Sequence, residues 1–410
     1  MTSPHTAVSD SYVEQELRRD VRAFTALALA ITLMLAISTC HYHRPLDSTI
    51  GLKITSLDLS TAESIESAEN PPNLTSWKNS IAGNGYYITG VSQFIDEGTG
   101  GEPPSLSVFG RRSSDKSIVW ATQIRVNDFT HPLDAPTHPD SSNEQSPSTK
   151  TTALTNDWTL SPNGKYVVFK LNSSTKATAY FAVVEASTGT VVRTTHITRR
   201  IIGVALTDTH LAVETSDQPF PGGSGNATLT VLSLLNQGAP PVTTPTTQWL
   251  IGTSHNSFLL SNYKYGDPCN SDHCTPMTVS RIGGTGQTID TVSGVIDVYS
   301  GGWISRFSDP AAASSLLAQI YDPIGIQERQ AANEQLRSIR RELVDPDSGQ
   351  HTDITDLLMK EVSLPTGPGL LALKQIPSDD AYAKYAPVFW LSSTDDGHPH
   401  TENLEQFKDN

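Results

Sequence analysis

The sequence of 410 residues predicts an all-β protein built from repeated antiparallel sheets and preceded by one transmembrane helix. Only 17% of the residues are charged, whereas 28 are Gly and 26 are Pro, a composition that favours strands and tight turns over helices. A single apolar stretch near the N-terminus is long enough to cross a bilayer. The formal net charge of -15 argues against a nucleic-acid partner, because the phosphates would be repelled.

The apolar stretch covers residues 23–42, which contain no charged side chain. Three arginines lie directly before it and only two basic residues follow it closely, so the positive-inside rule places the N-terminus in the cytoplasm. We expect a cytoplasmic tail at residues 1–22, a signal-anchor helix at 23–42, a linker at 43–50 and a large extracytoplasmic domain at 51–410. The protein is then a single-pass protein of the cell membrane.

Two alternatives to a retained anchor stay open. Cleavage near Ala36-Ile37-Ser38 would release a secreted protein. The run Ile37-Ser38-Thr39-Cys40 resembles a bacterial lipoprotein box, which would make Cys40 a lipidated residue.

The two remaining cysteines, Cys269 and Cys274, lie five positions apart in a turn-rich segment. In an exported domain this spacing is typical of a disulfide that closes a small loop. A metal site that adds Asp272 and His273 is the alternative, but zinc would need a second ligand pair, and the sequence offers none nearby. We therefore expect the disulfide and no metal site.

A tight turn followed by a strand-like run recurs six times. Residues that follow successive turns, Tyr166, Leu211, Phe258 and Trp303, are 45, 47 and 45 positions apart. A second hairpin completes each copy, most clearly at Ser187-Thr188-Gly189. The six copies begin at Asn84, Asn163, Asp208, His255, Gly301 and Gly367.

Four antiparallel strands every ~40–50 residues form the blade of a β-propeller, in which each blade covers its faces against its neighbours. We therefore predict a six-bladed β-propeller of four-stranded antiparallel blades over residues 51–410. Residues 52–59 form an extra strand, which we expect to pair with the C-terminal blade and close the ring. A composite blade made from residues 51–66 and the C-terminal tail would raise the number to seven.

By this repeat pattern the chain resembles the β-propeller superfamily of the quinoprotein-like or WD40-like kind. It has no Gly-His…Trp-Asp pair in each blade and no adjacent cysteines. Three turns resemble the Asp-box of sialidase-type propellers, in which an Asp braces a hairpin. They lie at residues 113–120, 345–352 and 393–397.

In an up-and-down blade, the first and third turns lie on one face, and the second loop and the link to the next blade lie on the other. We call the second face the long-loop face, because every long loop belongs to it. Loops of this kind either make a binding surface or accumulate where they do least harm. The long loops cover residues 94–105, 127–153, 216–228, 262–278 and 309–337.

The last of these loops contains a predicted helix at residues 326–343, where Ala332, Leu336, Ile339 and Leu343 recur at helical spacing. At the C-terminus, His398 and His400 with Glu402 could contact a metal, but we interpret them as part of an exposed acidic tail.

None of the common catalytic motifs occurs, including Gly-x-Ser-x-Gly, His-Glu-x-x-His and the phosphate-binding Gly-x-x-x-x-Gly-Lys. We therefore assign no catalytic, cofactor-binding or metal-binding residue and expect no cofactor. The leading hypothesis is a membrane-anchored binding or assembly module that engages a protein or cell-surface ligand through its long-loop face. The alternative is a propeller enzyme, either a sialidase-like glycoside hydrolase or a cofactor-dependent oxidoreductase. Its sign would be carboxylates, an arginine cluster or a tyrosine converging on the central axis of the long-loop face.

Overall fold

The computed structural model divides the chain into two compact units, Met1–Ser48 and Thr49–Asn410. All described residues lie in the second unit, so the predicted anchor at 23–42, Cys40, Cys269 and Cys274 fall outside them. Within the described part of the chain, no helix has the length and apolar character needed to span a membrane. The described residues are 51–67, 74–76, 80–82, 85–93, 105–126, 158–172, 178–217, 226–262, 276–321, 325–377, 384–394 and 398–407.

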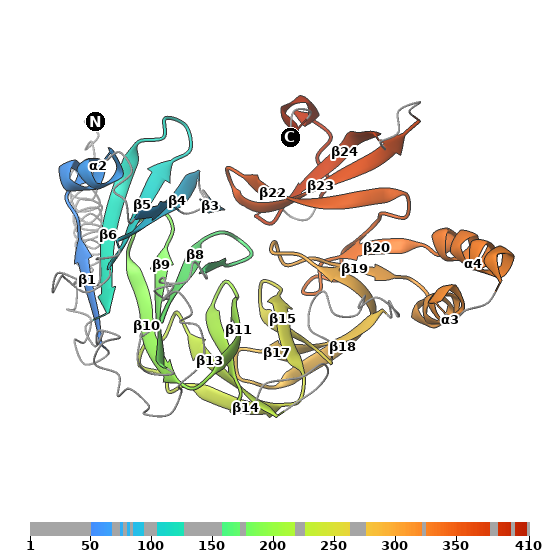
Figure 1. Cartoon of the computed structure of the whole chain (residues 1–410), viewed down its shortest axis with the longest axis horizontal. Coiled ribbons are helices and arrows are strands. Elements are labelled where there is room, and N and C mark those ends of the chain that lie inside the picture. Colours follow the sequence, from blue (N-terminus) through green and yellow to red (C-terminus); the bar gives the residue numbers. More distant parts are fainter. Residues whose placement is uncertain are drawn as a thin grey trace, which may run out of the picture. The chain divides into compact units, whose positions relative to one another are not determined.

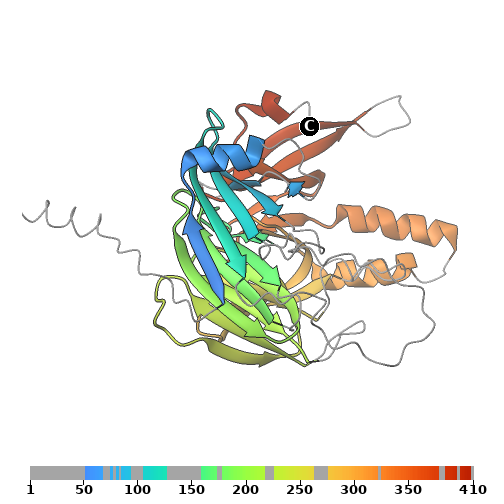
Figure 2. The same ribbon diagram turned by 60° about the vertical axis from the view of Figure 1, so that its left-hand side comes forward.

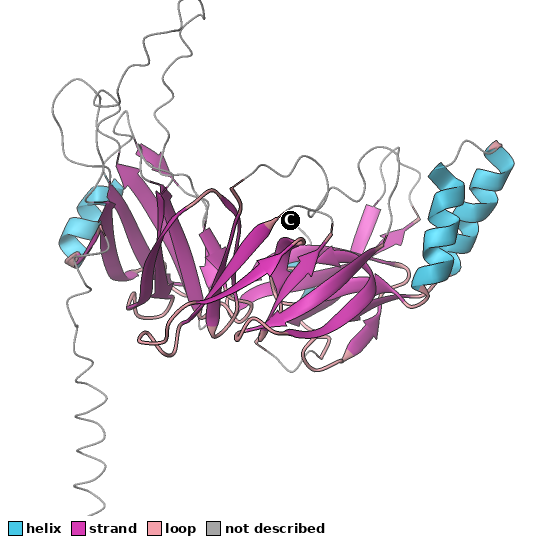
Figure 3. Cartoon of the chain, turned by 90° about the horizontal axis from the view of Figure 1, so that it is seen from below, coloured by secondary structure: helices cyan, strands magenta, loops and turns pink. Residues whose placement is uncertain are grey.

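The second unit consists mainly of antiparallel sheets (Figure 1; strands are magenta in Figure 3). The first sheet contains β1 (Leu52–Ser56), β2 (Leu74–Ser76), β3 (Ser80–Ala82), β4 (Tyr86–Gln93), β5 (Ser105–Arg112) and β6 (Ile118–Val126). The second contains β7 (Trp158–Leu160), β8 (Tyr166–Asn172), β9 (Thr178–Glu185) and β10 (Val191–Thr198). The third contains β11 (Ile201–Leu206), β12 (His210–Thr215), β13 (Ala227–Ser233) and β14 (Val242–Thr246).

The fourth sheet has seven strands because one long strand belongs to two successive hairpins. Residues 288–295 of β18 pair with β17 and residues 295–298 pair with β19, so Val295, next to Gly294 at φ 78°, pairs with both neighbours. The strands are β15 (Trp249–Thr253), β16 (Ser257–Ser261), β17 (Met277–Gly283), β18 (Thr288–Val298), β19 (Ile304–Phe307), β20 (Arg341–Val344) and β21 (His351–Asp353). The fifth sheet contains β22 (Leu357–Leu364), β23 (Gly367–Ile376) and β24 (Lys384–Ser392).

The hydrophobic core lies between successive sheets. Strand residues alternate between the two faces of a sheet, and in the central strands both sets are apolar, so each sheet is covered on both sides. Repeated antiparallel sheets whose faces are buried against their neighbours constitute a propeller-like fold. Pairs that share a buried cluster are Ile124 with Phe169, Phe181 with Leu211, Ala212 with Phe258, and Trp303 with Leu370.

The repeating hairpins predicted from the sequence are confirmed. Tight turns join β7 to β8, β11 to β12, β15 to β16 and β18 to β19, each at a predicted first turn. The turn that joins β22 to β23 lies at residues 365–366, just before the predicted position at Gly367. The predicted second turns join β5 to β6, β9 to β10, β13 to β14, β17 to β18 and β20 to β21. In two of the predicted Asp-boxes, Asp115 and Asp345 accept hydrogen bonds within their own turn, from Ser117 and Ser348 among others.

The predicted ring closure by residues 52–59 is wrong. Strand β1 pairs instead with β6, at the edge of the first sheet, where its apolar Leu52 and Ile54 pack into the cluster between the first and second sheets. The strand ends at Ser56, because Asp58 caps a helix, α2 (Leu59–Ser67), by accepting the N–H of Thr61 at 2.8 Å. Strand β3 contacts β22 and β23 of the fifth sheet, and Gly85 donates its N–H to Pro365 at 2.8 Å.

The predicted helix at 326–343 is too long, and a second helix was missed. Helices α3 (Pro310–Tyr321) and α4 (Ile326–Ser338) follow β19 and precede β20 in the chain. They pack on each other, as Figure 2 shows. Ile339 has extended dihedrals, and Leu343 lies in β20, within the cluster that holds Trp303. Burial of Leu343 in a sheet therefore overrides the helical spacing that it shares with α4.

The C-terminal segment is packed against the last sheet. His400 and Trp390 exchange backbone hydrogen bonds of 2.8 and 2.9 Å, and their rings stack with centroids 4.2 Å apart. His400 also pairs with Glu402 at 2.9 Å, and a short helix, η3 (Leu404–Phe407), follows. The segment is thus anchored to β24, while most of its residues, His398 and Glu402 among them, are exposed as predicted.

Candidate functional site

The first turns of the second, third and fourth sheets lie against one another. Asp208, in the β11–β12 turn, accepts the backbone N–H of Asn163 from the β7–β8 turn at 3.1 Å. Its own N–H donates to the carbonyl oxygen of His255, in the β15–β16 turn, at 3.1 Å. Turn residues that lie about one repeat apart in the sequence are thus brought together. We call Asn163, Asp208 and His255, with Arg281 and Asp347, the turn cluster.

The same local device shapes each of these turns. A Ser or Thr hydroxyl at the start of the turn accepts backbone N–H groups from the end of the turn. This fixes the backbone of the turn, and the side chains of Asp208 and His255 are not needed for it. The Oγ1 of Thr207 accepts the N–H of Thr209 and of His210, at 3.2 and 2.9 Å. The Oγ of Ser161 accepts the N–H of Tyr166 at 3.0 Å, and that of Ser254 accepts the N–H of Ser257 at 3.1 Å.

Two more turns approach this group, each at a glycine with positive φ. Gly302, in the β18–β19 turn, has φ 92°, and a Cβ there would lie 3.3 Å from Cβ of Pro162 and 3.5 Å from the backbone N of His255. Gly367, at the start of β23, has φ 138°, and a Cβ would lie 3.4 Å from the carbonyl oxygen of Asn163. The positive φ angles favour glycine at both positions.

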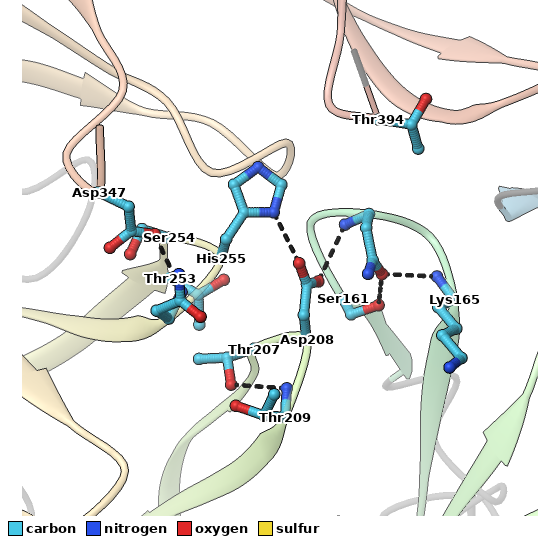
Figure 4. Close-up of polar contacts among 12 residues, drawn as sticks. Ser161, Lys165, Thr207, Asp208, Thr209, Thr253, Ser254, His255, Asp347 and Thr394 are labelled. Carbon is cyan, nitrogen blue, oxygen red and sulfur yellow. Dashed lines mark hydrogen bonds and ion pairs between the residues drawn. The ribbon is translucent and has the colours of Figure 1, made fainter. Parts of the chain in front are cut away.

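The central pair of the turn cluster is Asp208 and His255 (Figure 4). The Oδ2 of Asp208 lies 2.7 Å from Nδ1 of His255, and the two side chains are 17% and 25% exposed. The carboxylate accepts a hydrogen bond, so Nδ1 carries the proton in this contact. The Nε2 of His255 makes no hydrogen bond to any described residue, which leaves it available to a ligand.

The pKa of His255 stands above its ordinary value. Burial by itself lowers the pKa, but the hydrogen bond to Asp208 and the negative charges of Asp208, Asp345 and Asp347 outweigh it. His210, the first residue of β12, provides the contrast: its Nδ1 contacts the hydroxyl of Thr209, and burial lowers its pKa. The carboxylates around His255 therefore favour its protonated form.

Asp347 and Arg281 complete the turn cluster. The Oδ2 of Asp347 accepts the N–H of Asn256 at 2.9 Å, and its Oδ1 contacts Nη2 of Arg281 at 2.5 Å. A metal-type arrangement of three or more His, Cys, Asp or Glu side chains is not found within the described ranges. The imidazole of His255 can act in this cluster as a proton donor or acceptor that the carboxylate of Asp208 orients.

Sequence reasoning placed the functional surface on the opposite, long-loop face. There the structure has a cleft of about 570 Å³ between the third and fourth sheets. Hydroxyl and amide side chains such as Ser216, Asn226 and Gln248 line it, above Leu229 and Leu260. The signal for the turn cluster was present in the repeat itself, because Asn163, Asp208 and His255 occupy equivalent turn positions.

Comparisons with known proteins yield structural likeness only. No protein-family model matches the chain, and no curated protein matches its sequence. An acylaminoacyl peptidase from Pyrococcus horikoshii is similar with a TM-score of 0.38 and 10% identity, over 80% of this chain and 46% of that one. The β-propeller domain of the Trilobed protease from Pyrococcus furiosus is similar with a TM-score of 0.37 and 7% identity, over 80% and 84%. Prolyl oligopeptidase B from Galerina marginata is similar with a TM-score of 0.36 and 8% identity, over 80% of this chain and 43% of that one.

These findings correct the predicted function. The chain spans less than half of the length of the two whole peptidases, and the three structures named are peptidases or a peptidase's propeller domain. A non-catalytic binding or assembly module is therefore the wrong expectation. Carboxylates, an arginine and a histidine converge at the first turns, and not on the long-loop face where the alternative of a propeller enzyme placed its sign. The prediction of a β-propeller is confirmed: the repeated antiparallel sheets form a propeller-like fold.

Proposed function

We propose that the protein is a propeller enzyme that hydrolyses carbonyl-linked bonds, such as esters or amides. His255 is its proton-transfer group, and Asp208 is the partner that orients His255. The observation that carries the proposal is the 2.7 Å contact between Asp208 and Nδ1 of His255, with Nε2 left free. A carboxylate on one imidazole nitrogen fixes the tautomer and stabilises the imidazolium, so the other nitrogen can accept a proton.

The proposed reaction uses water as the nucleophile. As the water oxygen bonds to the carbonyl carbon, Nε2 of His255 takes one water proton, and the positive charge on the ring is balanced by Asp208. Nε2 then returns this proton to the leaving oxygen or nitrogen as its bond to the carbonyl carbon breaks. The products are a carboxylic acid and an alcohol or amine, and His255 is neutral again.

Hydrolysis of a glycosidic bond, the earlier alternative, is less well supported. That reaction needs one carboxyl group that can donate a proton and another that is free to act as a nucleophile or base. Here Asp208 is engaged by His255 and Asn163, Asp347 by Arg281 and Asn256, and Asp345 by its own turn. The imidazole is the group with a free reacting atom.

The test uses the full-length protein, purified in detergent and supplied with p-nitrophenyl esters and peptide p-nitroanilides of graded size. We expect hydrolysis of at least one reporter, with a rate that falls at least ~100-fold in His255→Gln and at least ~10-fold in Asp208→Asn. His210→Gln is the matched control, because His210, the first residue of β12, has no carboxylate partner among the described residues. Equal activity of His255→Gln and the wild type, or no hydrolysis of any reporter, would overturn the proposal.

We also propose that the propeller has six blades. Strand β18 would serve as the outer strand of one blade and the inner strand of the next, so the seven-stranded sheet counts as two blades. The six recurring first turns support this number. An experimental density map of the full-length protein with five or seven blades would refute it.

For residues outside the described ranges, we propose the single-pass anchor at 23–42, with the propeller outside the cell, and a disulfide between Cys269 and Cys274. Retention in the membrane pellet after carbonate extraction, with protease access to the propeller in intact cells, is the expected result for the anchor. Release into the supernatant would favour a cleaved signal. Mass spectrometry without reduction should find the peptides of Cys269 and Cys274 joined, and two free thiols would exclude the disulfide.

A further inference from the structure

The turn that carries His255 is held on both sides of that residue. Asn256, the next residue, donates its N–H to Asp347 at 2.9 Å. The Oγ atoms of Ser254 and Ser257 lie 2.6 Å apart, and Ser257 accepts a hydrogen bond from Nε of Arg281 at 3.1 Å. The backbone of residues 254–257 is thus held in place, and from this segment the imidazole of His255 contacts Asp208.

Arg281 connects these contacts into one network. Its guanidinium binds Ser257 through Nε, Asp290 through Nη1 at 2.9 Å and Asp347 through Nη2 at 2.5 Å. The side chain of Arg281 is 9% exposed and that of Asp347 is 13% exposed, so solvent screens this ion pair little. The planar guanidinium fixes the direction of each bond, which an ammonium group would not do.

We propose that Arg281 and Asp347 are positioning residues of the turn cluster: together they hold residues 254–257 so that His255 keeps its contact with Asp208. This inference rests on the proposed function of His255 as the proton-transfer group. Arg281 lies on β17 and Asp347 lies in the β20–β21 turn. Two separate parts of the fourth sheet therefore hold residues 254–257, which lead from β15 into β16 in the same sheet. Neither side chain contacts the reacting atoms.

A purely electrostatic role of Arg281 would have the opposite effect on His255. The charged groups that act on the imidazole are Asp208, from the third sheet, and Asp345 and Asp347, from the β20–β21 turn. Loss of the positive charge of Arg281 would expose the negative charge of Asp347 and raise the pKa of His255 further. Loss of positioning would instead separate His255 from Asp208 and lower that pKa. The direction of the shift therefore separates the two roles.

The experiment is a pH titration of the Cε1–H proton of His255 by NMR, with the resonance assigned by its absence in His255→Gln. The samples are the full-length wild type, Arg281→Gln, the conservative variant Arg281→Lys and the control Arg306→Gln. Arg306 pairs with Glu342 in the same sheet, at 3.1 Å. Thermal unfolding of each variant shows that it is folded. If Arg281→Gln does not fold, Asp347→Asn is titrated instead in a double-mutant cycle with Asp208→Asn.

We expect the pKa of His255 to fall in Arg281→Gln, to recover in part in Arg281→Lys and to stay unchanged in Arg306→Gln. In the cycle, Asp208→Asn should shift this pKa less than half as far in the Asp347→Asn background as in the wild type. An unchanged or raised pKa in Arg281→Gln, or an equal effect of Asp208→Asn in both backgrounds, overturns the inference. Neither readout uses hydrolysis, so an inactive wild type with the expected pKa shifts refutes the proposed function alone.

Discussion

The carboxylate of Glu214, on β12, accepts the backbone N–H of Leu250, on β15, at 2.9 Å, and so joins the third sheet to the fourth. Its other oxygen has no hydrogen-bond partner among the described residues, and the side chain is 0% exposed. Both neighbouring inner strands are bulged here, β11 between Ile201 and Gly203 and β15 between Leu250 and Gly252. Burial raises the pKa of Glu214 to about 7, and the N–H of Leu250 opposes the rise.

Stability should therefore depend on the ionisation of Glu214. An acid whose folded-state pKa is about 7, against 4.5 in the unfolded chain, destabilises the fold when it is charged. This penalty, at most about 3 kcal/mol, is full above pH 7 and disappears as the pH falls to the unfolded value. We expect Glu214→Gln to raise the free energy of unfolding at pH 8 and to have much less effect at pH 5. Urea denaturation at both pH values measures this.

Glu334→Gln is the control for Glu214, because Glu334 is exposed on α4. It should leave the pH dependence of unfolding unchanged. If Glu214→Gln destabilises the protein by the same amount at both pH values, the buried carboxylate is not the titrating group.

Gly189 and Gly349 form a matched pair in equivalent second turns. Their φ angles are 70° and 73°, but a Cβ at Gly189 would lie 2.5 Å from the indole of Trp120, whereas Gly349 has nothing within 4 Å. We expect Gly349→Ala to cost about 1 kcal/mol of unfolding free energy from its left-handed backbone. Gly189→Ala should cost a further ~1–3 kcal/mol from overpacking. Equal costs in denaturant titrations would show that Trp120 does not fill this space.

The pair of Asp208 and His255 should also contribute to stability in a pH-dependent way. Because the folded-state pKa of His255 is raised, the contribution is fully present below the ordinary imidazole pKa and is lost as the pH rises through the folded value. His255→Gln should therefore lower Tm more at pH 6 than at pH 9. His210→Gln should show the reverse trend, because burial lowers the pKa of His210. The same trend in both variants would contradict the role given to the carboxylates.

The C-terminal segment should stabilise the last sheet. Besides the ring stack with His400, the indole Nε1 of Trp390 donates to the carbonyl oxygen of Glu402 at 3.0 Å. Removal of residues 398–410 should cost about 1–3 kcal/mol, lower Tm and increase quenching of tryptophan fluorescence by acrylamide. Removal of residues 408–410 alone is the control and should change neither quantity. Unchanged quenching in the longer truncation would argue against the stack.

The local parts of the fold follow from the sequence, whereas its long-range pairings do not. Turn residues and alternating apolar runs predicted the hairpins, because these signals act within a few residues. The predicted pairing of residues 52–56 with the C-terminal blade was wrong. An apolar strand fits any free sheet edge, and its residue pattern does not specify which one. Leu343 shares helical spacing with α4 yet is buried in β20, where tertiary packing decides.

The turn cluster was missed for a related reason. Its side chains lie in separate turns and carry no motif, so their proximity follows only from the stacking of sheets. The repeat contained a partial signal, because it aligned Asn163, Asp208 and His255 at one turn position. It could not show Asp347, which reaches residues 254–257 from a second turn much later in the chain.

The central claim is that Asp208 holds the proton of His255 on Nδ1 and leaves Nε2 free. The direct test is the long-range ¹H–¹⁵N spectrum of the imidazoles in the full-length protein, at a pH above the pKa of His255. The account predicts the Nδ1–H tautomer for His255, with an unprotonated Nε2, and loss of this tautomer preference in Asp208→Asn. A neutral His255 that carries its proton on Nε2 in the wild type would contradict it.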